Sequence, residues 1–449
     1  MKKPESIYTY DDADAFALRQ QLRRKYMRCC LANGFSRLRA EPYRLLYFAL
    51  WGIAVLLCWQ LMFGGTLLVE YPGLLPFVVL LYIFLAGFAT ALFLITYGCP
   101  PHNRETTENL RRIGFYNSAC EIPFLLGESH DPADPRVRIL EFETFGLDLS
   151  AWTQNRLKIQ SALNVIIAKI EAGTDLRHIR LYTLPGDTAL PKSITWDWQQ
   201  TSKKDFELIL GESLMGSVKV NLNTTPHLLV AGATGSGKTS LLKCLLGQCI
   251  YKGADVYIAD FKGGVDFNLM WQGSADTLTD LREVDDTVQM LLVELEHRKQ
   301  LFRKVGAVSI QDYNECCRQE KPLRHIVFAV DEMAALTLAN PTDKQSKERV
   351  KSILDGLAVL ATQGRQFAIH LILSTQRPDR DVMPGQIKCN VDYAVCGRAN
   401  QVLSQIILDS TAAADAIPQD VPGRFINKDG EEFQSYWFDD YMLRAPEQP

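Results

Sequence analysis

The 449-residue sequence lacks a strong excess of charge of either sign, and its formal net charge at pH 7 is -4. A near-neutral balance gives no overall electrostatic signature of nucleic-acid binding, although one groove of such a protein can still be basic. The sequence also lacks a Cys-x-x-Cys pair, and two adjacent pairs, Cys29-Cys30 and Cys316-Cys317, cannot by themselves build a tetrahedral zinc site. We therefore expect reduced thiols, as in a cytosolic domain, rather than a disulfide framework.

Long low-complexity linkers and internal repeats of about 20 to 50 residues are also absent, so the sequence does not indicate a repeat protein. Apolar residues make up 47% of the chain, which is long enough for about two or three domains.

Charge is absent from two long apolar segments, Leu45 to Gly65 and Leu74 to Tyr97. Each exceeds the roughly 18 to 20 apolar residues that cross a bilayer, so we predict two transmembrane helices; a pair of buried core helices is the alternative. The connecting loop, residues 66–73, carries one charge, Glu70, whereas basic residues gather in the N-terminal arm and after the second segment. This distribution places both termini in the cytoplasm, with the protein in the cell membrane.

The N-terminal arm contains the basic cluster LRRKYMR, from Leu22 to Arg28. Such a cluster could contact anionic lipid or nucleic acid, but a topology signal on a solvated helix face explains it equally well. After the second apolar segment, residues 137–145 and 178–184 have strand character, and residues 155–170 have helical periodicity. These elements predict a small α+β domain next to the membrane.

A glycine-rich stretch follows the apolar run HLLVAG, which begins at His227, and precedes an apolar helical segment. It satisfies the P-loop pattern G-x-x-x-x-G-K-[ST]. Its backbone N–H groups would cradle the phosphates of ATP, Lys238 would reach the β and γ phosphates, and the hydroxyl of Thr239 would ligate Mg²⁺. The nucleotide-binding residues are predicted to be Gly232, Ala233, Thr234, Gly235, Ser236, Gly237, Lys238, Thr239 and Ser240.

Two acidic residues end a second apolar run, RHIVFAVDE, at Asp331 and Glu332. Ligands bind at the carboxyl ends of strands in open α/β sheets, so Asp331 is placed to hold Mg²⁺ and Glu332 to act as the general base toward water. Two acids that merely cap a strand are the alternative. A third apolar run ends in Ser-Thr-Gln, and a strand beside the P-loop strand would bring Gln376 near the γ-phosphate.

Four further blocks, together with the P-loop block that begins at residue 210, resemble the FtsK/SpoIIIE family of DNA-pumping ATPases. They include VYIADFKGG (256–264), the helix and turn ending in DYN (294–314), VDEMAAL (330–336) and GRQFAIHLILSTQRPDRDVMPGQIKCN (364–390). The resemblance covers about residues 210–426.

This resemblance implies a RecA-like α/β motor that works as a homo-hexameric ring around DNA, with ATP and Mg²⁺ between neighbouring subunits. It assigns catalytic roles to Lys238, Glu332 and Gln376. Arg365 corresponds to the arginine of the family's GRxxGIH block and would serve this site or a neighbouring one; a structural ion pair is the alternative.

The sequence also departs from the family. Gln405 stands where the family often has an arginine, which leaves Arg377 and Arg398 as substitute candidates for an arginine finger. The family's DNA-reading winged helix is not found before Pro449, and only two spans precede the motor, where cell-division members carry four.

These departures favour a relative of the division motor over the motor itself. Two short spans, a small membrane-proximal domain and a single motor resemble the coupling proteins of conjugative elements in Gram-positive bacteria, which implies a protein that passes DNA, with a relaxase, to a type IV secretion channel. The alternatives are a chromosome or plasmid segregation translocase, a protein-export ATPase and a nucleotide-gated membrane scaffold. The predicted organisation is a basic arm (1–44), a first span (45–65), an extracytoplasmic loop (66–73), a second span (74–97), an α+β domain (98–205) and the motor (206–449).

Overall fold

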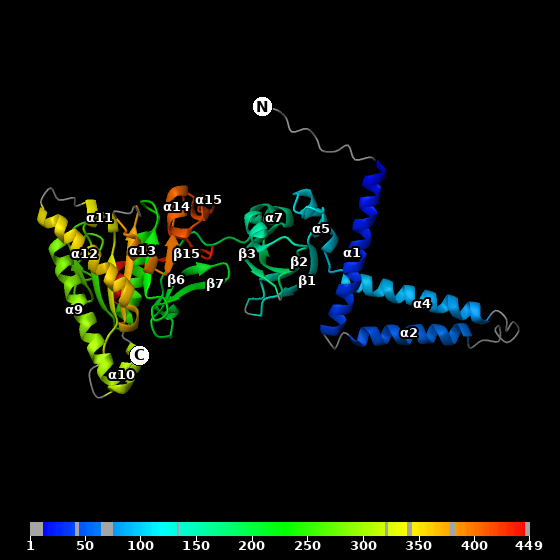
Figure 1. The fold of residues 1–449 in the computed structure, drawn as a ribbon, viewed down its shortest axis with the longest axis horizontal. Helices are drawn as coiled ribbons and strands as arrows, with labels where there is room; N and C mark the ends of the chain where they lie inside the picture. Colours follow the sequence, from blue (N-terminus) through cyan, green and yellow to red (C-terminus); the bar gives the residue numbers. More distant parts are fainter. Residues whose placement is uncertain are drawn as a thin grey trace, which may run out of the picture. The chain divides into compact units, whose positions relative to one another are not determined.

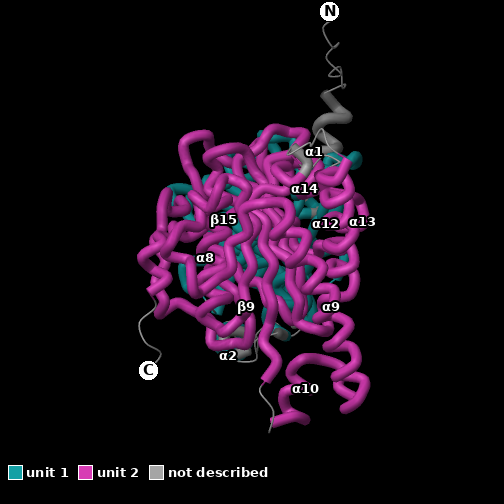
Figure 2. The backbone as a smooth tube through the Cα atoms, turned by 90° about the vertical axis from the view of Figure 1, so that its left-hand side faces the viewer, with its two compact units in different colours: residues 1–188 teal, residues 189–449 magenta. Residues whose placement is uncertain are grey.

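The computed structural model describes residues 12–40, 45–63, 75–132, 134–173, 175–318, 322–338, 344–377 and 382–444. The chain forms two compact units, residues 1–188 and 189–449, which are shown in two colours in Figure 2. The predicted extracytoplasmic loop, residues 66–73, and the start of the N-terminal arm lie outside the described residues.

Three long helices begin the first unit: α1 (Asp12–Ala40), α2 (Leu45–Phe63) and α4 (Leu75–Gly98) (Figure 1). The helices α2 and α4 pack together through aromatic rings, because the rings of Trp51 and Phe93 stack with centroids 5.4 Å apart and those of Trp59 and Tyr82 meet edge to face at 4.9 Å. This pairing makes α2 and α4 an antiparallel helical hairpin at the positions predicted for the two spans.

Within the described residues, one helical stretch, Pro76–Gly98, is long and apolar enough to cross a membrane. The apolar stretch in α2, Ala49–Gln60, is shorter than that. The first span, residues 45–65, and the cytoplasmic placement of both termini therefore stay predictions.

The rest of the first unit is the expected α+β domain. Its antiparallel sheet has the order β1-β2-β4-β3, formed by β1 (Phe124–His130), β2 (Arg138–Glu143), β4 (His178–Pro185) and β3 (Val165–Ala172). Three helices belong to this unit: α5 (Asn103–Arg112), α6 (Leu149–Gln154) and α7 (Arg156–Leu163). Leu110, Trp152, Ile159 and Phe142 are buried in its core.

The predicted helix over residues 155–170 is wrong in its second half. The helix α7 ends at Asn164, whose φ of 51° lies in the left-handed region, and the chain continues as β3. The strand begins with Val165, Ile166 and Ile167, and β-branched side chains favour strands because their χ1 freedom is restricted in helices. The spacing of apolar residues here fits the period of a helix and that of a strand equally well. The β-branched side chains favour the strand.

The second unit is built on one mixed sheet with the order β10-β9-β11-β12-β8-β13-β14-β15-β6-β7. Its parallel strands are β8 (His227–Ala231), β9 (Asp255–Ala259), β10 (Asp276–Leu278), β11 (Ile326–Val330), β12 (Ile369–Thr375) and β13 (Tyr393–Cys396). An antiparallel extension consists of β14 (Arg424–Asn427), β15 (Glu432–Trp437), β6 (Glu207–Ser213) and β7 (Gly216–Asn221). The strand β12 therefore lies between the P-loop strand β8 and β11, the strand that Asp331 follows.

Helices cover both faces of this sheet. Leu228 and Val230 of β8 join the core beneath α8 (Lys238–Tyr251), whereas Leu229 joins the core beneath α9 (Leu281–Val305) and α12 (Lys344–Gln363). Successive side chains of a strand point to opposite faces, so an uninterrupted apolar strand is buried on both sides. The remaining helices are α10 (Ile310–Cys316), α11 (Met333–Leu338), α13 (Gly385–Asn390), α14 (Gln401–Leu408), α15 (Ala412–Ala416) and the 3-10 turns η3 (Trp198–Gln200), η4 (Arg365–Phe367) and η5 (Asp440–Leu443).

The division between the units falls earlier than the predicted boundary after residue 205. The short strand β5 (Ile194–Thr195) pairs with β15, and Trp196 is buried in the core of the second unit. Residues from 189 onward therefore fold with the motor sheet.

Candidate nucleotide site

The predicted P-loop connects the end of β8 to the start of α8. Gly237 caps this helix with a φ of 97°, a left-handed conformation that glycine adopts without strain. A Cβ atom at Gly237 would also lie 2.6 Å from the backbone nitrogen of Gly423. The backbone of this loop is therefore packed against the turn that precedes β14, and only glycine fits there.

Lys238 is 7% exposed and its ammonium group donates hydrogen bonds to the carbonyl oxygens of Gly232, at 2.8 Å, and Ala233, at 3.2 Å. Burial lowers the pKa of Lys238, while the carboxylates of Glu332 and Asp331 oppose that shift. The ammonium group thus lies inside the curve of the loop, at the place where phosphates bind in P-loop proteins.

Asp331 accepts contacts from two sides of the site. Its Oδ1 lies 3.1 Å from the hydroxyl oxygen of Thr239, and its Oδ2 lies 2.7 Å from the ammonium nitrogen of Lys262. Lys262 also pairs with Asp266 at 2.6 Å. Partial burial lowers the pKa of Lys262, but the hydrogen bonds to Asp266 and Asp331 outweigh this effect and raise its pKa above the ordinary value.

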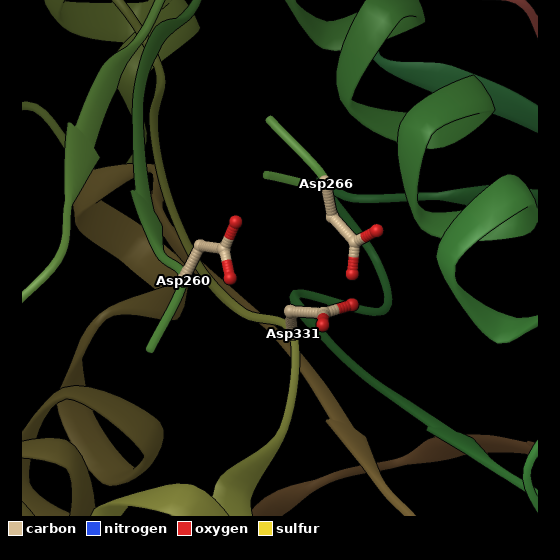
Figure 3. Close-up of side chains that lie close together, drawn as sticks. All are labelled: Asp260, Asp266 and Asp331. Carbon is tan, nitrogen blue, oxygen red and sulfur yellow. The ribbon is translucent and has the colours of Figure 1, made fainter. Parts of the chain in front are cut away.

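Three carboxylates, those of Asp260, Asp266 and Asp331, each offer an oxygen within 4.8 Å of the others (Figure 3). Asp260 follows β9 and is fully buried, and its Oδ2 has no hydrogen-bond partner among the residues that the structure describes. Oxygen ligands are those that Mg²⁺ prefers, and Mg²⁺ usually keeps several waters that need acceptors nearby. The set formed by Thr239, Asp331 and the buried Asp260 oxygen therefore fits a magnesium ion.

Glu332 is held by neighbouring backbone and side-chain donors. Its Oε1 accepts from the backbone N–H of Gln376 at 3.1 Å, from that of Ala334 at 3.2 Å and from the hydroxyl of Thr375 at 3.3 Å. Its Oε2 is buried and has no hydrogen-bond partner in the described part of the chain. A fixed carboxylate with one uncommitted oxygen is suited to accept a proton from a water molecule.

The tip of the P-loop is held from two strands that flank β8. The hydroxyl of Thr234 donates to Oε1 of Gln376 at 2.6 Å, just after β12. Arg398, just after β13, donates to the carbonyl oxygen of Thr234 at 2.7 Å and to that of Gln419 at 2.6 Å. Both terminal nitrogens of the Arg398 guanidinium thus donate hydrogen bonds within its own chain. This does not favour Arg398 as an arginine finger for a neighbouring subunit.

These groups surround a cavity of about 230 Å³. Its lining consists of Thr234, Gly235, Gly237, Lys238, Thr239, Ser240, Lys262, Asp331, Glu332 and Gln376. Gly232, Ala233 and Ser236 belong to the loop but not to this lining, and Ser236 is 2% exposed. The roles assigned to the individual residues stay predictions, although the structure brings most of them to one place.

Arg365 lies elsewhere. It belongs to η4, which precedes β12, whereas the site lies beyond the end of that strand. A strand of this length spans roughly 20 Å, so Arg365 does not reach the nucleotide site of its own chain. Service to a neighbouring subunit and a structural ion pair therefore both stay predictions for Arg365. Arg377 is exposed directly after Gln376, and Gln405 is exposed on α14.

Sequence reasoning assigned no role to Asp260, Lys262 or Asp266. The Asp-x-Lys pattern after an apolar strand was visible, but it did not show that β9 is adjacent to β11. That adjacency places Lys262 against Asp331.

Comparison with known proteins agrees with this geometry. The FtsK/SpoIIIE family profile matches residues 192–380. The DNA translocase FtsK of Oceanobacillus iheyensis is 32% identical over 239 residues, covering 49% of this chain and 28% of the relative. The DNA translocase SftA of Bacillus subtilis is 29% identical over 225 residues, covering 48% of this chain and 23% of the relative. The chain thus spans less than a third of the length of these relatives.

A solved structure is similar over a larger part of the chain. It is the monomer form of the pCW3 conjugation coupling protein TcpA with ATPgS, which is 32% identical with a TM-score of 0.57. The match covers 76% of this chain and 96% of that one. Taken with the family profile on the P-loop sheet, this similarity shows that the chain belongs to the FtsK/SpoIIIE family.

Proposed function

We propose that this protein is a membrane-anchored, ATP-driven DNA translocase that acts as a conjugative coupling protein. It would pass DNA, together with a relaxase, to a type IV secretion channel. The site supports ATP hydrolysis because it combines a P-loop lysine, an acidic metal-binding set and a fixed carboxylate beside one cavity.

Each group has a proposed part in hydrolysis. Lys238 binds the β and γ phosphates once it leaves the carbonyl oxygen of Gly232, and Thr239 and Asp331 hold Mg²⁺, which neutralises phosphate charge when bound. Glu332 takes a proton from the attacking water through its uncommitted oxygen. Gln376 contacts Thr234 at the loop tip and would respond to the γ-phosphate from there.

One observation carries the conjugation proposal. The match to the coupling protein covers 76% of this chain, more than the second unit alone supplies, so it reaches into the first unit. The curated FtsK and SftA relatives match only about half of the chain. Similarity beyond the motor favours a shared use of the membrane-proximal domain.

The proposed assembly is a homo-hexameric ring on the cytoplasmic face of the cell membrane. The helices α2 and α4 would anchor each subunit, with both termini in the cytoplasm, and DNA would pass through the ring. Arg365 lies too far from the site of its own chain and would act on a neighbouring subunit, and Arg377 is exposed next to the site. Basic side chains would contact DNA phosphates without selecting sequence.

The decisive experiment uses the full chain in its native host and in nanodiscs. ATP hydrolysis by the purified protein should rise when DNA is added, and Lys238→Ala should abolish both this activity and plasmid transfer from donor cells. Donor growth and chromosome segregation should be unaffected by Lys238→Ala. If segregation fails while transfer continues, the protein is a segregation translocase. Absence of any effect of single- or double-stranded DNA on the ATPase would contradict both DNA functions and favour protein export.

A further inference from the structure

Three large apolar side chains are exposed along one side of α1. Met27, Leu31 and Phe35 are spaced four residues apart and are 40%, 37% and 63% exposed. Residues four apart lie next to one another on a helix, so the three form a continuous stripe. We call Met27, Leu31 and Phe35 the apolar stripe of α1.

The rotation of α1 about its axis is fixed by its contacts with α4 and β1. The side-chain amide of Asn33 donates to the carbonyl oxygens of Gly98 and Leu126, each at 2.7 Å. A Cβ atom at Gly34 would lie 2.2 Å from the carbonyl oxygen of Leu94. The two helices therefore approach so closely that only glycine fits between them.

On either side of its contact with α4, the helix α1 faces different surroundings. On one flank, the ring of Tyr26 meets that of Phe124 at 5.4 Å and Asn33 reaches Leu126, so this flank faces the sheet of the α+β domain. On the other flank, Gly34 contacts Leu94, which lies one turn before the end of α4. At about 100° per residue, the apolar stripe lies on the flank of Gly34.

The apolar stripe thus faces toward the body of the apolar helix α4. That helix also exposes large apolar side chains, including Phe84, Phe88 and Leu92. Exposed apolar side chains that continue from one helix to the next favour an apolar environment shared by both helices. Binding to nucleic acid would not explain why three large apolar side chains are exposed along α1.

Arginine side chains lie beside the stripe. Arg24 and Arg28 are exposed one turn apart on α1, next to Leu31 and Phe35 by helical position. Arg37 instead contacts the end of α4, with its guanidinium 5.8 Å from the ring centroid of Tyr97. Long basic side chains at a membrane surface extend their charge to the phosphates while their stems stay in apolar surroundings.

We propose that α1 is a lipid-binding helix that lies in the headgroup layer of an anionic bilayer. Its apolar stripe enters the boundary with the acyl chains, and Arg24 and Arg28 bind lipid phosphates. This proposal rests on the membrane anchoring through α4 that forms part of the proposed function. Through Asn33, the same helix connects the bilayer surface to strand β1.

Photocrosslinking of the full chain tests this proposal in nanodiscs of phosphatidylcholine with a minor share of phosphatidylglycerol. Three single variants carry a photoreactive residue: Phe35→benzoylphenylalanine in the stripe, Ser36→benzoylphenylalanine as the exposed control one residue away, and Phe84→benzoylphenylalanine in α4. Mass spectrometry identifies the adducts. We expect lipid adducts from positions 35 and 84, few from position 36, and an excess of phosphatidylglycerol at position 35.

A second variant set tests the role of charge. Arg24→Gln and Arg28→Gln, introduced with the probe at position 35, should each lower the phosphatidylglycerol preference by roughly fivefold at most, while total lipid adducts persist. An unchanged preference would overturn the arginine–phosphate contact. Labelling at position 84 without an excess at 35 over 36, or adducts at 35 with protein only, would overturn the lipid-binding helix alone. Absence of lipid adducts at position 84 would overturn the membrane anchoring and this proposal together.

Discussion

The ammonium nitrogen of Lys262 lies 2.7 Å from Oδ2 of Asp331. This contact places a positive charge of the protein on the carboxylate that we propose for Mg²⁺. A cation that binds there must compete with the lysine, so the Asp-x-Lys stretch after β9 and the metal site cannot be fully engaged with Asp331 at the same time.

The Lys262→Met variant should therefore need less Mg²⁺ for half-maximal ATP hydrolysis. We expect a decrease of roughly three- to tenfold, because a charge-assisted hydrogen bond to Asp331 is removed and the lysine is half-exposed. A Mg²⁺ titration at saturating ATP measures this change. Lys299→Met, which removes a pair with Glu296 on α9, is the matched control and should leave the titration unchanged. A higher Mg²⁺ requirement in Lys262→Met would show that the lysine assists the metal instead.

The Asp260→Asn variant should have the opposite effect. The buried Oδ2 of Asp260 has no hydrogen-bond partner among the described residues, and an amide at this position would lose the negative charge that supports metal-bound water. We expect Mn²⁺, used as a spectroscopic substitute for Mg²⁺, to bind roughly tenfold more weakly with ATP present. Electron paramagnetic resonance of free Mn²⁺ gives this affinity without relying on turnover. Unchanged Mn²⁺ affinity would remove Asp260 from the metal environment.

The two ATPase variants should fail at different steps. Lys238→Ala loses the phosphate contact and should neither bind nor hydrolyse ATP measurably. Glu332→Gln keeps the loop and Lys238 intact, so it should bind ATP with near-normal affinity while hydrolysis falls by roughly a hundredfold or more. Equilibrium binding of a fluorescent ATP analogue, alongside phosphate release, separates these outcomes. Normal turnover in Glu332→Gln would exclude it as the general base.

Alanine variants of two glycines distinguish the effect of backbone strain from the effect of a steric clash. Gly237 and Gly253 both have positive φ, at 97° and 82°, but only a Cβ atom at Gly237 would meet another group, the nitrogen of Gly423. Gly253→Ala should lower the free energy of unfolding by about 1 to 2 kcal/mol and leave ATP binding unchanged. Gly237→Ala should, in addition, weaken ATP binding by roughly tenfold or more, because the loop must shift. Equal effects on ATP binding would contradict this distinction.

Three buried histidines, His227, His325 and His370, lie at or beside the first residues of β8, β11 and β12, at the strand ends away from the nucleotide site. They should make the free energy of unfolding depend on pH. Burial lowers the pKa of His227 to about 4 and that of His325 to about 4, and Nδ1 of His325 lies 2.9 Å from Nε2 of His370. The unfolded chain binds protons at the ordinary pKa of 6.5, so the unfolding free energy should fall as pH drops from about 6.5 to about 4. Each histidine would contribute up to roughly 3 kcal/mol.

Urea denaturation across this pH range measures the effect. The slope should decrease in His325→Gln, which removes one buried titrating group. His297→Gln is the control, because His297 is exposed on α9, and its slope should match that of the unchanged protein. A slope that does not change in His325→Gln would contradict the buried histidine explanation.

Sequence reasoning anticipated the parts of the site that local patterns determine. The P-loop, Asp331 and Glu332 follow apolar strands, and parallel strands bring their carboxyl ends to one edge of a sheet.

The parts that depend on which strands are adjacent were out of reach. Lys262 meets Asp331 only because β9 lies beside β11, and Arg398 meets Thr234 only because β13 lies beside β8. Residues 189–205 contain no strong local pattern, so their packing on β15 could not be foreseen. The change from helix α7 to strand β3 at Asn164 could not be foreseen either, because the spacing of the apolar residues alone fits a helix and a strand equally well.

The two hydrogen bonds that hold Thr234 have a mechanical consequence. Gln376 holds its hydroxyl from the end of β12, and Arg398 holds its carbonyl from the end of β13. A displacement of the loop tip during the nucleotide cycle must stretch or break one of these bonds, and it therefore pulls on the strands at both sides of β8. Force generated at the phosphates would spread laterally through the sheet, which would give each subunit of the proposed ring a stiff element with which to push against DNA.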